Sequence, residues 1–235
     1  MSTVVINDEH FKDIANAIRK KTGESTTYKP REMANAISNI SNVQNTGDVD
    51  SFLSKNITQI FNNKVTSVGY NAFYYDKTIT SVSFPLATTL QDNAFWHCSN
   101  LETANFASVK DVGSQAFKDC YGLKNVYMPS EGITLYTNAF NACTSLEKIE
   151  FNSLIKIWGG VFDYCSSLTA LILRSTSNVM TICVDTNGFT KTPIASGTGY
   201  IYVPSALIDT YKADSFWKQY INQLRAIEDY PDICG

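Results

Sequence analysis

The sequence predicts an α/β repeat solenoid of short, stacked parallel strands, with a small helical N-terminal module and a helical C-terminal cap. Two observations carry this prediction. A phenylalanine recurs at positions 73, 95, 117, 140 and 162, in steps of 22, 22, 23 and 22 residues. Five residues before it stands an aliphatic side chain in every unit, namely Val68, Leu90, Val112, Leu135 and Ile157. A constant period of this length is the sequence signature of a repeat architecture.

Each unit ends in a pattern that indicates a short strand. Two apolar residues stand two positions apart, as in Val82 and Phe84 or in Ile149 and Phe151. A spacing of two is the period of a strand, so both side chains face the same side. One unit cannot bury such a row alone. We therefore expect the units to stack and their strands to pair in parallel, so that equivalent side chains form continuous apolar columns.

The one 23-residue step lies in the connector between Met128 and Leu135. This connector is one residue longer than its counterparts in the other units, and it contains Gly132. Glycine is typical of turns and loops because it adopts backbone conformations that other residues avoid. The extra residue is therefore interpreted as a loop adjustment.

Four of the six cysteines follow the repeat. Cys98, Cys120, Cys143 and Cys165 each stand three residues after a repeated phenylalanine. This common phase predicts a stacked column of small, reduced, buried side chains, which is the usual role of a free cysteine in a packed interior. Cys183 and Cys234 fall outside the register, and their pairing is left open.

These residues carry a family resemblance. The pattern AF..C..L..I.F, present as AFWHCSNLETANF and AFNACTSLEKIEF, resembles the BspA-like (Treponema pallidum-type) leucine-rich repeats of bacterial surface and phage proteins. It covers roughly residues 65–203. The resemblance implies a right-handed leucine-rich repeat solenoid used for adhesion or recognition. Asp76 replaces the repeated cysteine in the first unit, which suits a terminal rung that is more exposed to water.

The sequence predicts three parts. Residues 1–45 hold two short helical patterns and the start of a polar linker; residues 46–203 form the solenoid, with five regular rungs over 65–175 and an irregular last rung; residues 204–235 form the cap. In the cap we expect two short helices, broken near Ala213–Asp214, that cover the open end of the solenoid. The string IANAIRKKTG…YKPREMANAIS resembles a small module of tail-associated proteins in phages and prophages of gut Firmicutes. This second resemblance implies attachment to a larger assembly.

Composition and motifs argue against several functions. The net charge of −3 lacks the basic field that nucleic-acid binding depends on. No stretch approaches the roughly 18 to 20 apolar residues of a membrane span, and the N-terminus lacks the pattern of a secretion signal. His10 and His97 are the only histidines, and no metal, cofactor or nucleophile motif is present. We expect no catalytic, cofactor or metal site, and we interpret Cys98 beside His97 as a core residue because neighbours in extended backbone face opposite sides.

Two surfaces are candidate binding sites. The first is the outer face of the strands, which changes chemistry along the stack; its simpler interpretation is a solvated sheet. It consists of Ser81, Ser83, Thr103, Asn105, Asn125, Tyr127, Lys148, Glu150, Ala170 and Ile172. The second is an aromatic rim beside the repeated phenylalanine, part of which would pack between neighbouring rungs. It consists of Tyr70, Tyr74, Tyr75, Trp96, Tyr121, Tyr136, Trp158 and Tyr164.

The function expected from these features is non-enzymatic recognition. The leading hypothesis is a phage or prophage tail-associated protein, located in the virion, whose repeats bind a bacterial surface glycan or protein. Residues 1–45 would then attach it to other virion proteins. The alternative is a bacterial surface adhesin or a protein–protein interaction module, located at the cell surface. An enzyme acting on cell-wall glycans ranks third.

Overall fold

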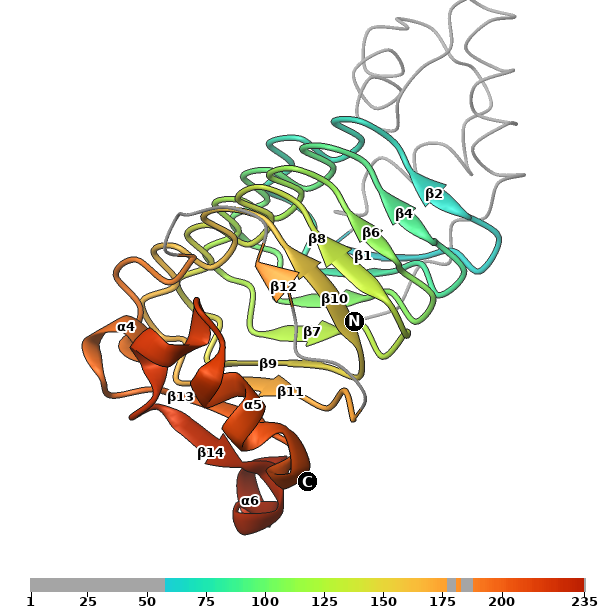
Figure 1. The fold of residues 1–235 in the computed structure, drawn as a ribbon. Coiled ribbons are helices and arrows are strands. Elements are labelled where there is room, and N and C mark those ends of the chain that lie inside the picture. Colours follow the sequence, from blue (N-terminus) through green and yellow to red (C-terminus); the bar gives the residue numbers. More distant parts are fainter. Residues whose placement is uncertain (1–57, 177–180, 183–187, 235) are drawn as a thin grey trace, which may run out of the picture.

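The computed structural model describes residues 58–176, 181–182 and 188–234. The expected helical module in residues 1–45 and Cys183 lie outside these residues. Within them the chain winds into a solenoid whose rungs are stacked along one axis, with strands on two opposite faces (Figure 1). The predicted α/β repeat solenoid is confirmed.

The first face, called the front sheet, contains the strand predicted for each rung. Pairing is parallel, and it advances by one repeat per rung: Ser81 lies opposite Thr103, and Thr103 opposite Asn125. The sheet consists of two parts. One has the order β1-β3-β5-β7 and the other β9-β11-β13-β14. The strands are β1 (Gln59–Phe61), β3 (Ser81–Ser83), β5 (Thr103–Asn105), β7 (Asn125–Tyr127), β9 (Lys148–Phe151), β11 (Ala170–Leu173), β13 (Tyr200–Val203) and β14 (Leu224–Ala226).

The opposite face, called the rear sheet, holds a second strand per rung that the sequence did not predict. Most of these strands have only two or three residues, which is too short for an alternating pattern to be visible. They contain the aliphatic position five before each phenylalanine, and Val68 pairs with Leu90 and Leu90 with Val112. The strands are β2 (Ser67–Val68), β4 (Thr89–Leu90), β6 (Asp111–Val112), β8 (Ile133–Leu135), β10 (Leu154–Ile157) and β12 (Thr181–Ile182).

A column of stacked phenylalanine rings runs through the interior between the sheets. Phe73, Phe95, Phe117 and Phe140 stack nearly parallel, with ring centroids 5.0 to 5.1 Å apart. This distance matches the spacing of roughly 4.7 to 4.9 Å between neighbouring strands, so one ring fits one rung. The chain turns sharply around each ring, and the residues two before and two after it have positive φ, as Asn93 does at 58° and His97 at 60°.

The predicted cysteine column is confirmed. All four thiols are buried and free. Each donates a hydrogen bond to the carbonyl of the phenylalanine one rung earlier, as Cys98 Sγ does to Phe73 O at 2.9 Å and Cys120 Sγ to Phe95 O at 3.1 Å. Burial raises the pKa of the Cys120 thiol and, with Cys165 beside it, that of the Cys143 thiol. These thiols are therefore neutral core groups.

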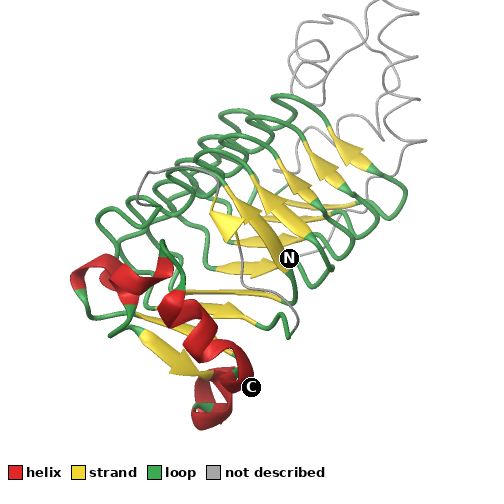
Figure 2. Cartoon of the chain, viewed as in Figure 1, coloured by secondary structure: helices red, strands yellow, loops and turns green. Residues whose placement is uncertain are grey.

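The C-terminal residues close the solenoid with short helices gathered at one end of the described chain (Figure 2). An irregular rung adds Phe189 to the ring column, and the rings of Trp217 and Tyr220 pack on it with centroids 6.2 and 5.5 Å away. The helical segments are α4 (Pro193–Ser196), η1 (Ser205–Leu207), α5 (Ile208–Ala213), η2 (Trp217–Tyr220), η3 (Ile227–Asp229) and α6 (Pro231–Cys234).

The prediction of a second helix in this region is wrong for residues 224–226, which form a strand. Leu224 belongs to strand β14, which pairs in parallel with β13 through Ile201 and Leu224. The sequence spacing suggested a helix because the aromatic residues before it recur at three to four positions. Residues Leu224–Ala226 instead add a final strand to the open edge of β13. This pairing provides hydrogen-bonding partners for backbone groups that would otherwise stay unpaired. None of the helices described here is long and apolar enough to cross a bilayer.

Candidate functional site

The front sheet is interrupted between the third and fourth rungs. Strand β7 pairs with β5, and β9 pairs with β11, but no backbone pairing joins β7 to β9 in the described part of the chain. The two rungs remain joined elsewhere. Val112 of β6 pairs with Leu135 of β8 in the rear sheet, and Phe117 N donates to Ala139 O at 2.7 Å in the turn. The rungs therefore separate only along the front sheet.

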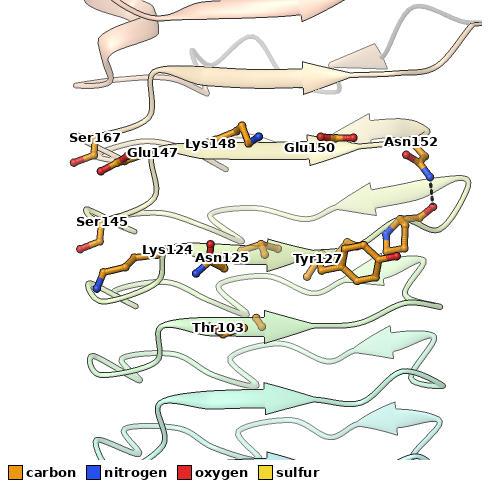
Figure 3. A pocket seen from close by; sticks show the side chains of 14 residues that line it. Thr103, Lys124, Asn125, Tyr127, Ser145, Glu147, Lys148, Glu150, Asn152 and Ser167 are labelled. Atoms are coloured by element: carbon orange, nitrogen blue, oxygen red, sulfur yellow. Dashed lines mark hydrogen bonds between the residues drawn. The ribbon is translucent and has the colours of Figure 1, made fainter. Parts of the chain in front are cut away.

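The interruption coincides with the single inserted residue. The longer connector runs from β7 in the front sheet to β8 in the rear sheet, and its Gly132 adopts a φ of 77°. Beyond it, the rear-sheet register returns to that of the neighbouring rungs at Leu135. Asn152 Nδ2 donates to Pro129 O at 2.7 Å and links the two rungs at the end of the gap (Figure 3). The rear sheet is irregular beside the same connector, because the pairing of β8 with β10 shifts register between Leu154 and Lys156. The insertion thus coincides with a missing pair, β7 and β9, in the front sheet and with a register shift in the rear sheet.

A groove of about 800 Å³ opens at this interruption. We call it the inter-rung groove. Figure 3 shows Lys124, Asn125 and Tyr127 along one wall and Glu147, Lys148 and Glu150 along the other. Its remaining lining residues are Thr103, Ala104, Val126, Met128, Pro129, Ser145, Asn152 and Ser167. Polar side chains of both strands thus converge on one concave surface, which is the usual form of a ligand site.

The structure brings five of the predicted outer-face residues together in this groove. They are Thr103, Asn125, Tyr127, Lys148 and Glu150. Asn105 lies on β5 opposite Tyr127 and does not line the groove. The groove also contains five residues that the repeat pattern did not predict as site residues. They flank the strands and are Lys124, Ser145, Glu147, Asn152 and Ser167. The available signal was the 23-residue step, which marks where the stack is irregular.

The groove has equal numbers of positive and negative side chains. Lys124 on one wall and Lys148 on the other are matched by Glu147 and Glu150, so the formal charges of its lining cancel. Lys124 Nζ lies 3.7 Å from the carboxylate of Glu102, and both side chains are 56% exposed, so this ion pair contributes little. In the described part of the chain, the side chains of Asn125, Tyr127 and Glu147 have no hydrogen-bonding partner, and Tyr127 is 57% exposed.

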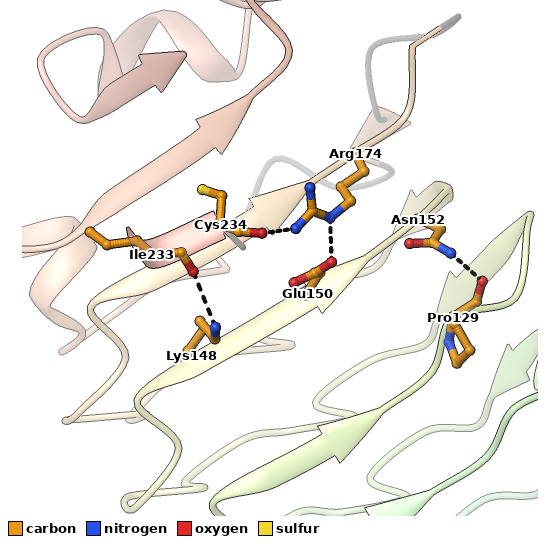
Figure 4. A network of polar contacts seen from close by, with 7 residues as sticks. All are labelled: Pro129, Lys148, Glu150, Asn152, Arg174, Ile233 and Cys234. Atoms are coloured by element: carbon orange, nitrogen blue, oxygen red, sulfur yellow. Dashed lines mark hydrogen bonds and ion pairs between the residues drawn. The ribbon is translucent and has the colours of Figure 1, made fainter. Parts of the chain in front are cut away.

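The C-terminal segment borders the groove on one side (Figure 4). Lys148 Nζ donates to Ile233 O at 3.1 Å, and Arg174 bonds both to the carboxylate of Glu150 and to the carbonyl of Cys234. The hydrogen bond that Arg174 donates to the carboxylate of Glu150 raises the pKa of Arg174, which stays charged. Lys148 and Glu150 are thereby held in place at the rim of the groove.

The same C-terminal segment covers part of the face that was expected to be exposed. Ala170 and Ile172 are 7% and 0% exposed because they pack with Tyr202 and Cys234 in a small apolar cluster outside the sheet. The expectation that these two residues face solvent is wrong. Both side chains are apolar and are covered by C-terminal residues. The repeat pattern could not reveal this cover, because the covering residues lie outside the repeats.

The aromatic rim divides into separate groups. Tyr74, Tyr75 and Trp96 are in mutual contact, and Tyr75 stacks on His97 at 4.3 Å, which in turn meets Tyr121 edge-on at 5.6 Å. Tyr136 and Trp158 form a second group, stacked at 6.2 Å. Tyr164 is exposed on the fifth rung.

A second, shallower hollow of about 440 Å³ lies over the rear sheet. Tyr70 and Tyr136 stand at its two sides, Asp92 and Asp111 line it, and Gly113 leaves room between them. The rim residues therefore do not form one continuous surface.

Groups that could support chemistry are sparse in the described residues. His97 Nδ1 lies 3.8 Å from Asp119, while the neighbouring Cys98 thiol is buried and bonded to a carbonyl. The side chains of His97 and Cys98 diverge because His97 lies in a turn, with a φ of 60°. The expectation of extended backbone at these two residues is wrong. No cluster of three or more His, Cys, Asp or Glu side chains suited to a metal occurs in the part of the chain that the structure covers.

Comparison with known protein families identifies the repeats. A model of the BspA type leucine rich repeat region matches residues 46–169 and 88–198, with six copies. The chain belongs to the BspA-type leucine-rich repeat family. The resemblance seen in the AF..C..L..I.F pattern is thus confirmed, and no curated protein matches the chain.

Two solved structures resemble this BspA-type repeat protein. A leucine rich cell surface protein from Faecalibacterium prausnitzii A2-165 is 22% identical, with a TM-score of 0.37 over 52% of this chain and 40% of its own. A leucine-rich repeat protein from Bacteroides ovatus ATCC 8483 is 24% identical, with a TM-score of 0.35 over 60% of this chain and 48% of its own. The match therefore spans less than half of either structure.

Proposed function

We propose that this BspA-type repeat protein is a non-enzymatic recognition scaffold that binds another molecule through the inter-rung groove. The observation that carries the proposal is the interrupted front sheet, which places unpaired strand edges and unpartnered polar side chains on one concave surface. A rigid stack of rungs holds these groups in fixed positions, so little conformational entropy is lost on binding. The bacterial surface is the proposed location of the ligand, a glycan or a protein.

The proposed setting is a phage or prophage tail. This finer proposal rests on the resemblance of the string IANAIRKKTG…YKPREMANAIS to modules of tail-associated proteins. In this setting residues 1–45 attach the repeats to other virion proteins, and the repeats contact the host cell.

The binding function is tested by incubating the fluorescently labelled full chain with a panel of gut Firmicutes cells. Specific, saturable binding that falls when Tyr127 is replaced by alanine is the expected result. Thermal unfolding of the variant checks that the fold is retained. Absence of binding to every strain, or binding that Tyr127→Ala leaves unchanged, would contradict the proposal.

The alternative is a bacterial surface adhesin or a protein–protein interaction module. The cell-surface description of the Faecalibacterium prausnitzii structure favours this setting. Antibody detection in virions purified from an induced lysogen, compared with detection on intact cells, separates the two. Signal in virions supports the tail setting, and signal on uninduced cells alone supports the adhesin.

A further inference from the structure

The gap between β7 and β9 restricts what can enter the inter-rung groove. Residues of the two strands have Cα atoms within 8 Å of each other. A strand inserted between them would need two strand spacings, which is about 9.4 to 9.8 Å. The gap is therefore too narrow for a peptide strand that pairs with both edges. A ligand must instead lie over the mouth of the groove and contact the side chains.

The charges in the groove favour a neutral ligand. Two ammonium groups, on Lys124 and Lys148, are balanced by two carboxylates, on Glu147 and Glu150. A strongly anionic ligand would meet the carboxylates of Glu147 and Glu150 on the β9 wall, and a strongly cationic ligand would meet Lys124 on one wall and Lys148 on the other. A neutral ligand whose groups both donate and accept hydrogen bonds can use the ammonium, amide and carboxylate groups together.

Tyr127 supplies the apolar element of the same surface. The residue is 57% exposed and lies toward the Asn152 end of the groove, after Asn125 along the strand (Figure 3). An exposed tyrosine ring offers a flat apolar face with a polar end at low conformational cost. The C–H face of a pyranose ring fits such a surface. Glu147 lies at the opposite end of the groove, beside Lys124 (Figure 3), so hydroxyls of further sugar units, each a donor and an acceptor, would reach Asn125 and Glu147.

We propose that the inter-rung groove binds a neutral oligosaccharide that runs along it, with Tyr127 stacking on one sugar ring and Asn125 and Glu147 bonding to hydroxyls of further sugar units. This inference rests on the proposed recognition function and names the ligand class of the same site. Lys148, which donates to Ile233 O, and Glu150, which accepts from Arg174, define the far wall.

The test begins with the full chain on an array of neutral, acidic and amino oligosaccharides. Calorimetric titration with the strongest neutral oligosaccharide follows. We expect Tyr127→Ala to weaken binding at least about 10-fold, and Glu147→Gln, which keeps the size of the side chain, to weaken it as well. Because the ligand is neutral, the dissociation constant should stay within about 2-fold between low and high salt.

The matched control is Tyr164→Ala. Tyr164 is also an exposed tyrosine, at 52%, and it lies outside the groove. The equivalent position of the fourth rung is Ala142, with nearly the same φ, so alanine is tolerated there. This variant should bind the oligosaccharide as the unmodified chain does.

Several results would overturn the proposal. They are the absence of any neutral oligosaccharide bound on the array, a preference for acidic glycans, or binding that Tyr127→Ala does not weaken. The cell assay separates this failure from failure of the proposed function. Cell binding that depends on Tyr127 but survives periodate oxidation of surface sugars means that the site is correct and the ligand class is wrong. Absence of cell binding counts against the recognition function itself.

Discussion

Single positions show how closely the rungs pack. Gly69 and Gly113 stand at the same place in two rungs, four residues before the repeated phenylalanine. A Cβ atom at Gly113 would lie 2.7 Å from three backbone atoms of the preceding rung, whereas at Gly69 it would meet nothing within 4 Å. The difference arises because Gly69 lies in the first of the five rungs and Gly113 has a rung stacked beneath it.

These two glycines give a paired prediction. Gly113→Ala should lower the free energy of unfolding by about 1 to 3 kcal/mol, because backbone of the preceding rung must move. Gly69→Ala should change it by no more than about 0.5 kcal/mol. Chemical denaturation of both variants measures the difference. Equal effects would contradict the rung-on-rung contact described for Gly113.

The cysteine column gives a prediction about reactivity. Alkylation requires the thiolate, and burial raises the pKa of the Cys120 and Cys143 thiols. Iodoacetamide at pH 8 should leave the peptides containing Cys98, Cys120, Cys143 and Cys165 unmodified in the folded protein and modify them after denaturation. Peptide mapping by mass spectrometry checks this, and rapid labelling of any of the four in the native state would argue against the column.

At the scale of elements, the cap is held by aromatic contacts with the last rung. Trp217 is fully buried and meets Phe189 at the end of the ring column, while Ile221, four residues later, is 46% exposed. Trp217→Ala should destabilise the protein by about 3 to 5 kcal/mol, since it removes a large buried side chain. Ile221→Ala should have an effect of about 0.5 kcal/mol or less. Thermal unfolding compares the two, and similar shifts would refute this role of Trp217.

The connector between β7 and β8 gives a second prediction at this scale. Glu131 is exposed and belongs to the longer connector, so its deletion restores a 22-residue step. We expect β7 and β9 to pair in the shortened protein, with slower hydrogen exchange at the amides of β9 and loss of ligand binding. Deletion of a residue from the regular connector of the second rung, such as Ser108, is the control and should destabilise the stack. Unchanged exchange in β9 would show that the insertion does not cause the gap.

For the whole molecule, buried thiols and a buried tyrosine hydroxyl make the free energy of unfolding depend on pH. The pKa of Cys120 and Cys143 is raised above the ordinary value of 9.0, and burial raises that of Tyr220 to about 12. Above pH 9 the unfolded chain loses these protons first, so the native state binds more protons and stability falls as pH rises. The stability that these three groups contribute is fully present below pH 9. It is lost as the pH rises through their pKa values in the folded protein.

The melting temperature should therefore decrease between pH 9 and pH 11. A double variant with Cys120→Ala and Cys143→Ala, compared at each pH with its own value at pH 8, should show a shallower decrease. Differential scanning calorimetry at closely spaced pH values measures both slopes. Parallel slopes would mean that these thiols do not contribute to the alkaline decrease.

Much of the fold follows from local pattern. The spacing of Phe95 and Phe117 sets the period, the spacing of two between Val82 and Phe84 sets the strand, and the common phase of Cys98 and Cys120 sets the column. All three are confirmed, because stacked identical units repeat the same short-range environment, so one unit describes the others. The rear strands escaped notice because two-residue segments have no visible period.

The repeating pattern was sufficient to predict the repeat, the register of its columns and the chemistry of residues that face outwards. Which of those residues meet depends on the folded chain. Tyr127 and Glu150 share one groove because β7 does not pair with β9, and Ile172 is buried because the chain end returns over it. Both outcomes depend on contacts between segments far apart in sequence, and a pattern with a period of 22 residues carries no information about them.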